Sequence, residues 1–312
     1  MSAVEASSEP RLRLHALRWP SWLPLPGDYP RLTAGGLVLL ALVASAVFAP
    51  LITHTSPTQQ HLKDIFHPPG SAYPLGTDQL GRDVLSRALY GGRLSLGVAL
   101  ASVALSMVVG VIAGLVAGYV GRWADGAVMR VMDGIMVFPE LVLALAITYA
   151  LGPSFWNVVT AIAVVNVPKF ARVVRGQVLS LRERDFIASA VVAGASRTRT
   201  MARHLLPNVL EVIVVQAALT GGMAIFTAAS LSFLGLGLPP PAPDWGGMLK
   251  DGYLYLGVMP LQALVPGGFI FAAMLSFNLL GDGLRDLFDP RTAPRSRMRR
   301  ERAARRRAGG MP

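Results

Sequence analysis

Charged residues are absent from five long stretches of the chain, and each stretch is rich in apolar side chains. The stretches are residues 32–62, 94–121, 141–168, 212–243 and 252–281. A helix needs about 20 apolar residues to cross the hydrocarbon core of a bilayer, whereas a helix on a soluble core keeps a polar outer face. The pattern therefore predicts an all-α membrane protein.

The stretch at 141–168 holds parts of two spans, because Gly152 and Pro153 interrupt it with helix-breaking residues. Six transmembrane helices result. The first could instead be a cleaved signal peptide, but its long polar leader and its length favour an uncleaved anchor. The predicted spans are residues 32–52, 94–120, 134–151, 155–174, 209–233 and 264–280.

Lys and Arg residues predict the orientation, because they accumulate on the cytoplasmic side. With the N-terminus inside, the inner segments hold 24 of the 29 Lys and Arg residues, and the inner loops alone hold 10 against 5 outside. The predicted organisation is a cytoplasmic leader at 1–31, the first span at 32–52, an external segment at 53–93, a five-helix core at 94–284 and a basic cytoplasmic tail at 285–312.

The formal net charge of +11 follows largely from this topology, so it does not indicate a nucleic-acid partner. The arginine-rich stretch 295–307 could bind anionic lipid or RNA. We interpret it instead as a positive-inside flank.

Three glycines repeat at a spacing of four residues in the second predicted span. Gly110, Gly114 and Gly118 therefore share one helix face. Small residues let helices approach closely in lipid. The contact could join two chains or lie within this one.

Polar residues inside or near the spans are candidates for function. Asp133 and Glu140 flank the start of the third span, and Arg130 is spaced to pair with Asp133 on a helix. A structural ion pair is favoured over a proton relay. The residues that could line a pathway, or merely hydrogen-bond between helices, are Asn166, Gln216 and Asn278.

The sequence carries no constellation typical of an enzyme. It has no Gly-x4-Gly-Lys-Ser/Thr phosphate-binding loop, no zinc-protease helix motif, no serine nucleophile elbow and no cysteine. His54, His61 and His67 share the external segment, but their spacing matches no standard metal site. We expect no catalytic residue, cofactor or metal in this chain.

The soluble segment at 180–207 has the pattern of helix, turn, helix. Asp185 and Ser196 are candidate N-caps, Gly194 suits a left-handed helix stop, and Pro207 fits the first turn of the next span. The first helix is small and apolar, with arginines around it. Such a helix can dock in a groove of another protein or lie on the membrane surface.

This segment resembles the EAA loop of ABC-importer permeases, in which Glu-Ala-Ala is followed by three residues, Gly, nine residues and Ile-x-Leu-Pro. Ala188, Ser189 and Ala190 fall on the Glu-Ala-Ala positions, and Gly194 falls on the Gly. His204 replaces the Ile, and Leu206 and Pro207 match the Leu-Pro. The expected ATPase-coupling residues are Asp185, Ile187, Ala188, Ser189, Ala190, Gly194, Ala195, Ser196, Arg203, His204 and Pro207.

Further stretches narrow the resemblance to the C-type permease of dipeptide, oligopeptide and nickel importers. They are residues 74–87, 231–240, 244–248 and 278–290. The likeness covers about residues 32–291, and it implies the type I ABC importer permease fold.

The resemblance implies a complex with a paralogous permease subunit, two ABC ATPase subunits that bind ATP and Mg²⁺, and an external solute-binding protein. This chain would then be a transport subunit, without its own ATPase site, in the lipid bilayer of the inner membrane. Peptides are the expected substrate, with nickel or another small solute as the alternative. An ion-coupled secondary transporter using Asp133 and Glu140 is the more distant possibility.

Overall fold

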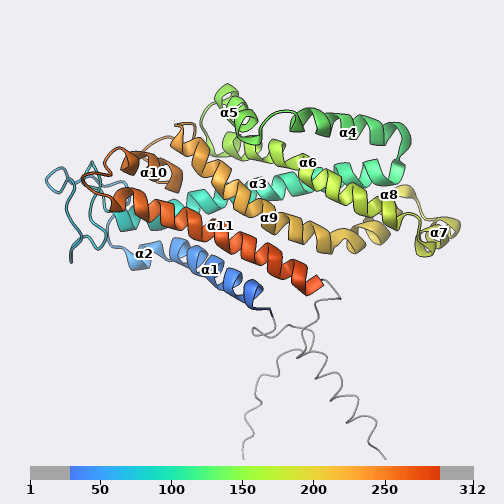
Figure 1. Cartoon of the computed structure of the whole chain (residues 1–312), viewed down its shortest axis with the longest axis horizontal. Coiled ribbons are helices and arrows are strands. Elements are labelled where there is room, and N and C mark those ends of the chain that lie inside the picture. The colour runs from blue at the N-terminus through green and yellow to red at the C-terminus, as the bar shows by residue number, and fades with distance from the viewer. Residues whose placement is uncertain (1–28, 289–312) are drawn as a thin grey trace, which may run out of the picture.

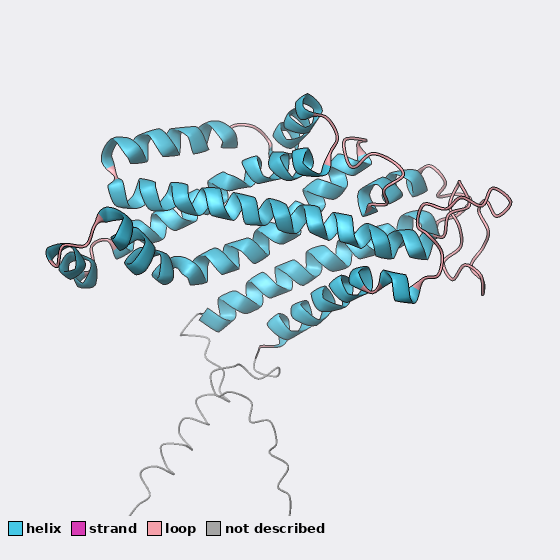
Figure 2. Ribbon diagram, turned by 180° about the vertical axis from the view of Figure 1, so that it is seen from behind, coloured by secondary structure: helices cyan, strands magenta, loops and turns pink. Residues whose placement is uncertain are grey.

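The structure is a computed structural model that describes residues 29–288. Most of the predicted leader (1–31) and of the predicted basic tail (285–312), including the arginine-rich stretch 295–307, lies outside the described residues. All regular elements between residues 29 and 288 are helical, as Figure 2 shows. The helices are α1 Pro30–Val47, α2 Ala49–Ile52, α3 Val84–Val120, α4 Arg122–Met136, α5 Glu140–Leu151, α6 Phe155–Leu181, α7 Asp185–Val192, α8 Arg197–Thr200, the π-helical turn η1 Met201–Leu205, α9 Leu206–Phe233, α10 Trp245–Tyr253 and α11 Leu261–Phe288.

Within the described residues, five helical runs are long and apolar enough to cross a membrane. They are α1, α3, α6, the continuous run Arg197–Phe233, and α11. The bent pair of α4 and α5 makes a sixth span if it is counted as one. The all-α membrane fold is thus confirmed.

The third predicted span, 134–151, is not one straight helix. The chain bends by 90° between α4 and α5, at Pro139, which is extended (φ −54°, ψ 130°) and precedes Glu140. Proline lacks the amide hydrogen that a continuing helix would use. At 12 residues, α5 is about 18 Å long and too short to cross the bilayer alone.

Three helices extend beyond their apolar stretches. α3 begins at Val84, ten residues before the predicted start, so residues 84–93 belong to a helix and not to an irregular external segment. α6 continues to Leu181 and α11 to Phe288. Lys169 and Arg172 fall inside the predicted span 155–174, although we counted them with the inner Lys and Arg residues. Arg175 follows that span, and all three lie within α6.

The glycine stripe of α3 forms a contact within the chain, against α6. A Cβ atom on Gly110 would lie 2.5 Å from Phe170 Cβ, and one on Gly114 would lie 2.6 Å from the Ala171 carbonyl oxygen. A Cβ on Gly118 would lie 2.8 Å from Val178. Only glycine permits this separation of the two helices, so the stripe sets the central packing of the bundle.

The bundle has two distinct sides and two distinct ends (Figure 1). α4 and α5 lie over α6 on one side, whereas α1 and α11 lie on the opposite side (Figures 1 and 2). α7 protrudes from one end, and residues 53–83 with α10 cover the other. The start of α1 and the end of α11 are adjacent, with Arg31 Nη1 at 3.7 Å from Asp286 Oδ2. Both described ends of the chain thus lie next to each other.

Candidate functional site: the protruding segment and the polar residues

The segment between α6 and α9 folds as the predicted helix, turn and helix, and it protrudes from one end of the molecule (Figure 1). Gly194 ends α7 with φ +83°. Its amide donates to the Val191 carbonyl (3.0 Å), and the amide of half-buried Ala195 donates to the Ala190 carbonyl (3.0 Å). This pair of bonds is the Schellman motif, so the predicted left-handed stop is confirmed.

Two of the other predicted landmarks are confirmed and one is wrong. Ser196 caps α8 by accepting a hydrogen bond from the Arg199 amide (3.3 Å), and Pro207 lies in the first turn of α9. Asp185 does not cap α7: the N-cap position is Arg184, without a side-chain hydrogen bond, and Asp185 is the first helical residue. Its carboxylate instead lies at the positive end of the helix dipole.

One buried side chain fixes α7 to the bundle. Ile187 is 3% exposed and packs in a cluster with Val178 of α6, Leu205 of η1 and Val209 of α9. Motion of α7 would therefore be transmitted directly to α6 and α9, two of the spanning helices.

The rest of α7 faces outward. Ala188 and Ser189 are exposed, and Phe186, Val191 and Val192 are 42%, 50% and 89% exposed. Exposed arginines flank this apolar surface, including Arg184 and Arg203. An apolar surface with a charged rim is typical of a protein interface.

Sequence reasoning missed the π-helical turn η1, which joins α8 to α9 and contains Arg203 and His204. A π turn carries one extra residue per turn and is frequent at functional sites. Nothing in the residue types of 201–205 distinguishes it from an ordinary helix, so no sequence signal could have found it.

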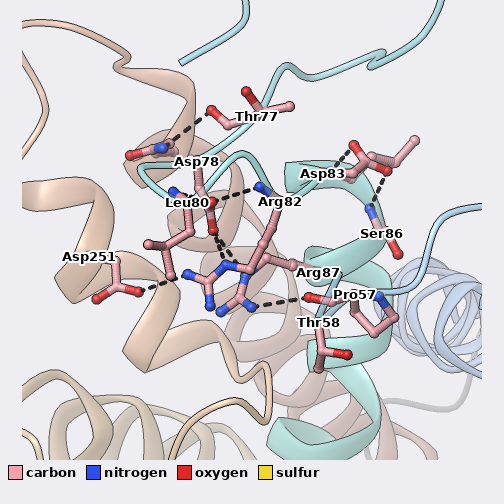
Figure 3. A network of polar contacts seen from close by, with 12 residues as sticks. Pro57, Thr58, Thr77, Asp78, Leu80, Arg82, Asp83, Ser86, Arg87 and Asp251 are labelled. Atoms are coloured by element: carbon pink, nitrogen blue, oxygen red, sulfur yellow. Dashed lines mark hydrogen bonds and ion pairs between the residues drawn. The ribbon is translucent and has the colours of Figure 1, made fainter. Parts of the chain in front are cut away.

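The opposite end carries a buried polar network, shown in Figure 3, that sequence reasoning did not single out. Asp78 accepts hydrogen bonds from the amides of Leu80 and Arg82 (2.9 Å each) and from Arg82 Nε (2.6 Å). Arg87 Nε lies 3.5 Å from Asp78, and Arg87 Nη1 donates to the Pro57 carbonyl (3.1 Å).

This network closes the external segment onto the bundle. Asp83 caps α3 and accepts a hydrogen bond from Thr55 (3.0 Å), and Arg82 lies 3.7 Å from Asp251 of α10. Beside it is a polar cavity of about 340 Å³ whose wall includes Arg87, Asp244 and Lys250. One sequence signal could have pointed to this network. Asp78 and Arg82 have opposite charges and lie four residues apart in a segment without an apolar pattern.

The three predicted pathway residues do not converge. Asn166 of α6 is buried and donates to the Ile162 carbonyl (2.8 Å). Gln216 bonds Thr220 within α9 (3.1 Å), and Asn278 of α11 is exposed. No hydrogen bond joins any two of the three in the part of the chain that the structure describes. A role in lining a pathway stays a prediction for each.

The two membrane carboxylates have partners, one of them unexpected. Asp133 pairs with Arg172 of α6 at 2.5 Å, and not with Arg130 of its own helix. Glu140 pairs with Lys169 at 2.7 Å. Both acids are thus held in ion pairs between α4 or α5 and α6, which is the structural alternative to a proton relay.

Comparison with known proteins gives the same result as the geometry. Residues 110–294 match the family described as "Binding-protein-dependent transport system inner membrane component". Over 257 residues the chain is 44% identical to a dipeptide transport system permease protein of Alkalihalophilus pseudofirmus, covering 82% of this chain and 84% of that protein.

Two further relatives carry related names. One is a glutathione transport system permease protein of Pectobacterium atrosepticum, 43% identical over 83% of this chain and 86% of that protein. The other is a di/tripeptide transport system permease protein of Pseudomonas aeruginosa, 41% identical over 82% and 87%. With its helical spans and protruding helix, turn and helix, the chain belongs to the family of inner-membrane permease components of binding-protein-dependent transport systems.

Proposed function

We propose that this chain is a permease subunit of an ABC importer that translocates di- or oligopeptides. An external solute-binding protein delivers the peptide, and separate ATPase subunits with bound ATP and Mg²⁺ supply the energy. A paralogous permease completes the membrane channel. Peptides are favoured over nickel because the similar proteins are named for dipeptide, di/tripeptide and glutathione transport.

The observation that carries the proposal is the outward surface of α7. Val192 is 89% exposed among the residues that the structure describes, while Ile187, five residues earlier, anchors the same helix to α6 and α9. A helix so anchored transmits a push from a partner to the spanning helices. ATP-driven closure of an ATPase dimer is a rigid-body motion of the kind that can be passed on in this way.

The proposal also assigns the orientation. The end with α7 faces the cytoplasm, where the ATPases lie, and so do the N- and C-termini, because α1 begins and α11 ends on that side (Figure 1). The external segment, with its polar cavity, then faces the solute-binding protein.

An ion-coupled secondary transporter would need a carboxylate that is free to change partners. Asp133 and Glu140 are each held by a basic residue of α6, at 2.5 and 2.7 Å. No specific observation favours the ion-coupled carrier.

Co-purification tests the proposal. The tagged chain is expressed from its native locus and extracted in mild detergent, and the proteins that co-purify with it are identified by mass spectrometry. In parallel, uptake of a radiolabelled dipeptide is measured in this strain and in a strain that lacks the gene. We expect an ATPase with a phosphate-binding loop, a second permease, and uptake that is lost on deletion. Recovery of the chain alone, under conditions that preserve a known importer, would refute the proposal.

A further inference from the structure

Three ion pairs join the bent pair α4 and α5 to one side of α6. Arg175 pairs with Asp125 of α4 (Nε to Oδ1, 2.5 Å) and Arg172 with Asp133 of α4 (2.5 Å). Lys169 pairs with Glu140, the first residue of α5 (2.7 Å). The basic partners are spaced by three residues, so the pairs occupy about 9 Å of helix rise. We call these six residues the ion-pair stripe.

Lys169, which pairs with Glu140, lies near the middle of α6. Lys169 is 14 residues from Phe155 and 12 residues from Leu181, which is about 21 and 18 Å along the helix. The hydrocarbon core is about 30 Å thick. A core that lies wholly within the length of α6 therefore includes Lys169, and the pair with Glu140 is then at membrane depth.

The stripe is not sealed inside the bundle. The Arg172 and Asp133 side chains are 46% and 62% exposed, and those of Lys169 and Glu140 are 29% and 26% exposed. Charged groups at this depth are costly in contact with lipid and face a protein partner or water. The exposed charges on the side formed by α4 and α5 therefore call for water or a protein partner, although apolar residues such as Val131 (60%) and Val142 (54%) are exposed there too. On the opposite side, the exposed residues Leu37 and Leu40 of α1 are apolar.

One atom of the stripe has an unused hydrogen-bonding capacity. Glu140 Oε2 accepts from Lys169, but Glu140 Oε1 is shielded from solvent and has no partner among the described residues. Lys169 also donates to Asn166 Oδ1 at 2.8 Å. A buried carboxylate oxygen without a donor is unfavourable, and an N–H or ammonium group arriving from outside the chain would satisfy it.

We propose that the ion-pair stripe lines the water-filled translocation path and forms a polar track for the charged termini of a zwitterionic peptide. The inference rests on the proposed function. Glu140, whose Oε1 has no partner among the described residues, offers a carboxylate oxygen for the ammonium terminus, and the basic residues of the stripe offer groups for the carboxylate terminus. Val137 and Phe138, exposed beside the stripe at 77% and 55%, provide apolar surface for side chains of different kinds. All peptides share the termini, so such a track accepts many sequences.

Cysteine labelling tests whether the stripe faces water, and the chain has no native cysteine to interfere. Gly134→Cys and Val137→Cys place a thiol beside the stripe; a Cβ on Gly134 meets no atom within 4 Å. Leu37→Cys and Leu40→Cys on α1 are the matched controls on the opposite side. Each variant is assembled into the complete transporter and treated with a membrane-impermeant charged maleimide.

We expect the two thiols beside the stripe to react at least about tenfold faster than the α1 thiols, because only a solvated thiol forms the reactive thiolate. Equal, slow labelling of all four thiols would overturn the inference. That result would leave the proposed function intact if the wild-type complex still imports a dipeptide. Loss of wild-type import, in contrast, would refute the function itself.

A double variant, Glu140→Gln combined with Lys169→Gln, tests the charges. Both side chains can still hydrogen-bond, but neither carries charge. We expect dipeptide uptake to fall by about tenfold while ATPase activity stimulated by the binding protein continues. If uptake and ATPase activity fall together, the pair is structural; if neither changes, the charges play no part. Either result would overturn the polar track.

Discussion

The exposed end of α7 offers a quantitative test of ATPase docking through Val192→Ser. The Val192 side chain is 89% exposed in the chain alone. Burying a valine side chain completely contributes about 1.5–3 kcal/mol. If an ATPase groove covers Val192, its loss should weaken association by about 1.5–2.5 kcal/mol, or roughly 10- to 70-fold in the dissociation constant.

The permease should remain folded, because Val192 contributes almost nothing to the buried interior. The matched control is Val258→Ser, which removes the same atoms from a residue that is 65% exposed at the external end. Both variants are titrated with purified ATPase subunit in lipid nanodiscs, and thermal stability is measured in parallel. A change of less than about twofold for Val192→Ser, or an equal change for Val258→Ser, would refute the docking argument.

Three further predictions concern the coupling segment, the glycine stripe and the external end. Gly194→Leu and Gly194→Asp should uncouple ATP hydrolysis from uptake while the protein still inserts. The space around Gly194 is open among the described residues, so the added bulk or charge would meet the ATPase groove and not this chain. Gly194→Asn is uncharged and tolerates φ +83° better than leucine, so it should retain more uptake; normal uptake by the Leu and Asp variants would contradict the prediction. Gly114→Ala should destabilise the bundle by about 1–3 kcal/mol in an unfolding assay, since its Cβ would lie 2.6 Å from the Ala171 carbonyl oxygen, whereas Gly126→Ala, with no atom within 4 Å, should not. Burial raises the pKa of the Asp244 carboxyl above its ordinary value of 3.8, so the contribution of this group to stability is full below about pH 4 and is lost as the pH rises through the folded-state pKa. Asp244→Asn can still accept from the Gly247 amide (3.0 Å) and should melt at a higher temperature than the wild type at neutral pH. This difference in melting temperature should close toward about pH 4, and a difference independent of pH would disprove the assignment.

The order of the spans could be predicted from the sequence because a bilayer imposes a minimum length of apolar helix. The same holds for local signals that depend on one residue's backbone chemistry. Gly152 ends α5 with φ +83°, and Gly194 ends α7 in the same left-handed region. Such signals act within a few residues, so they can be read without knowing the fold.

The helix ends were harder to predict from hydrophobicity. α3 begins at Val84, with Asp83 as its cap, ten residues before the apolar stretch, and α6 continues past its predicted end at residue 174 to Leu181. Backbone hydrogen bonds continue a helix whatever the polarity of its side chains. A boundary drawn where charges begin therefore marks where an uninterrupted apolar surface ends, and not where the helix ends.

The sequence by itself determined the membrane class, the approximate spans, the break at Gly152 and the helix, turn and helix at 180–207. Only the tertiary structure decided the partners of the polar residues: Asp133 meets Arg172, which is 39 positions away, and not Arg130 on its own helix. It also decided that Gly110, Gly114 and Gly118 pack on α6. Spacing along one helix fixes which residues share a face, but the choice between a local and a distant partner depends on which helices the whole fold brings together.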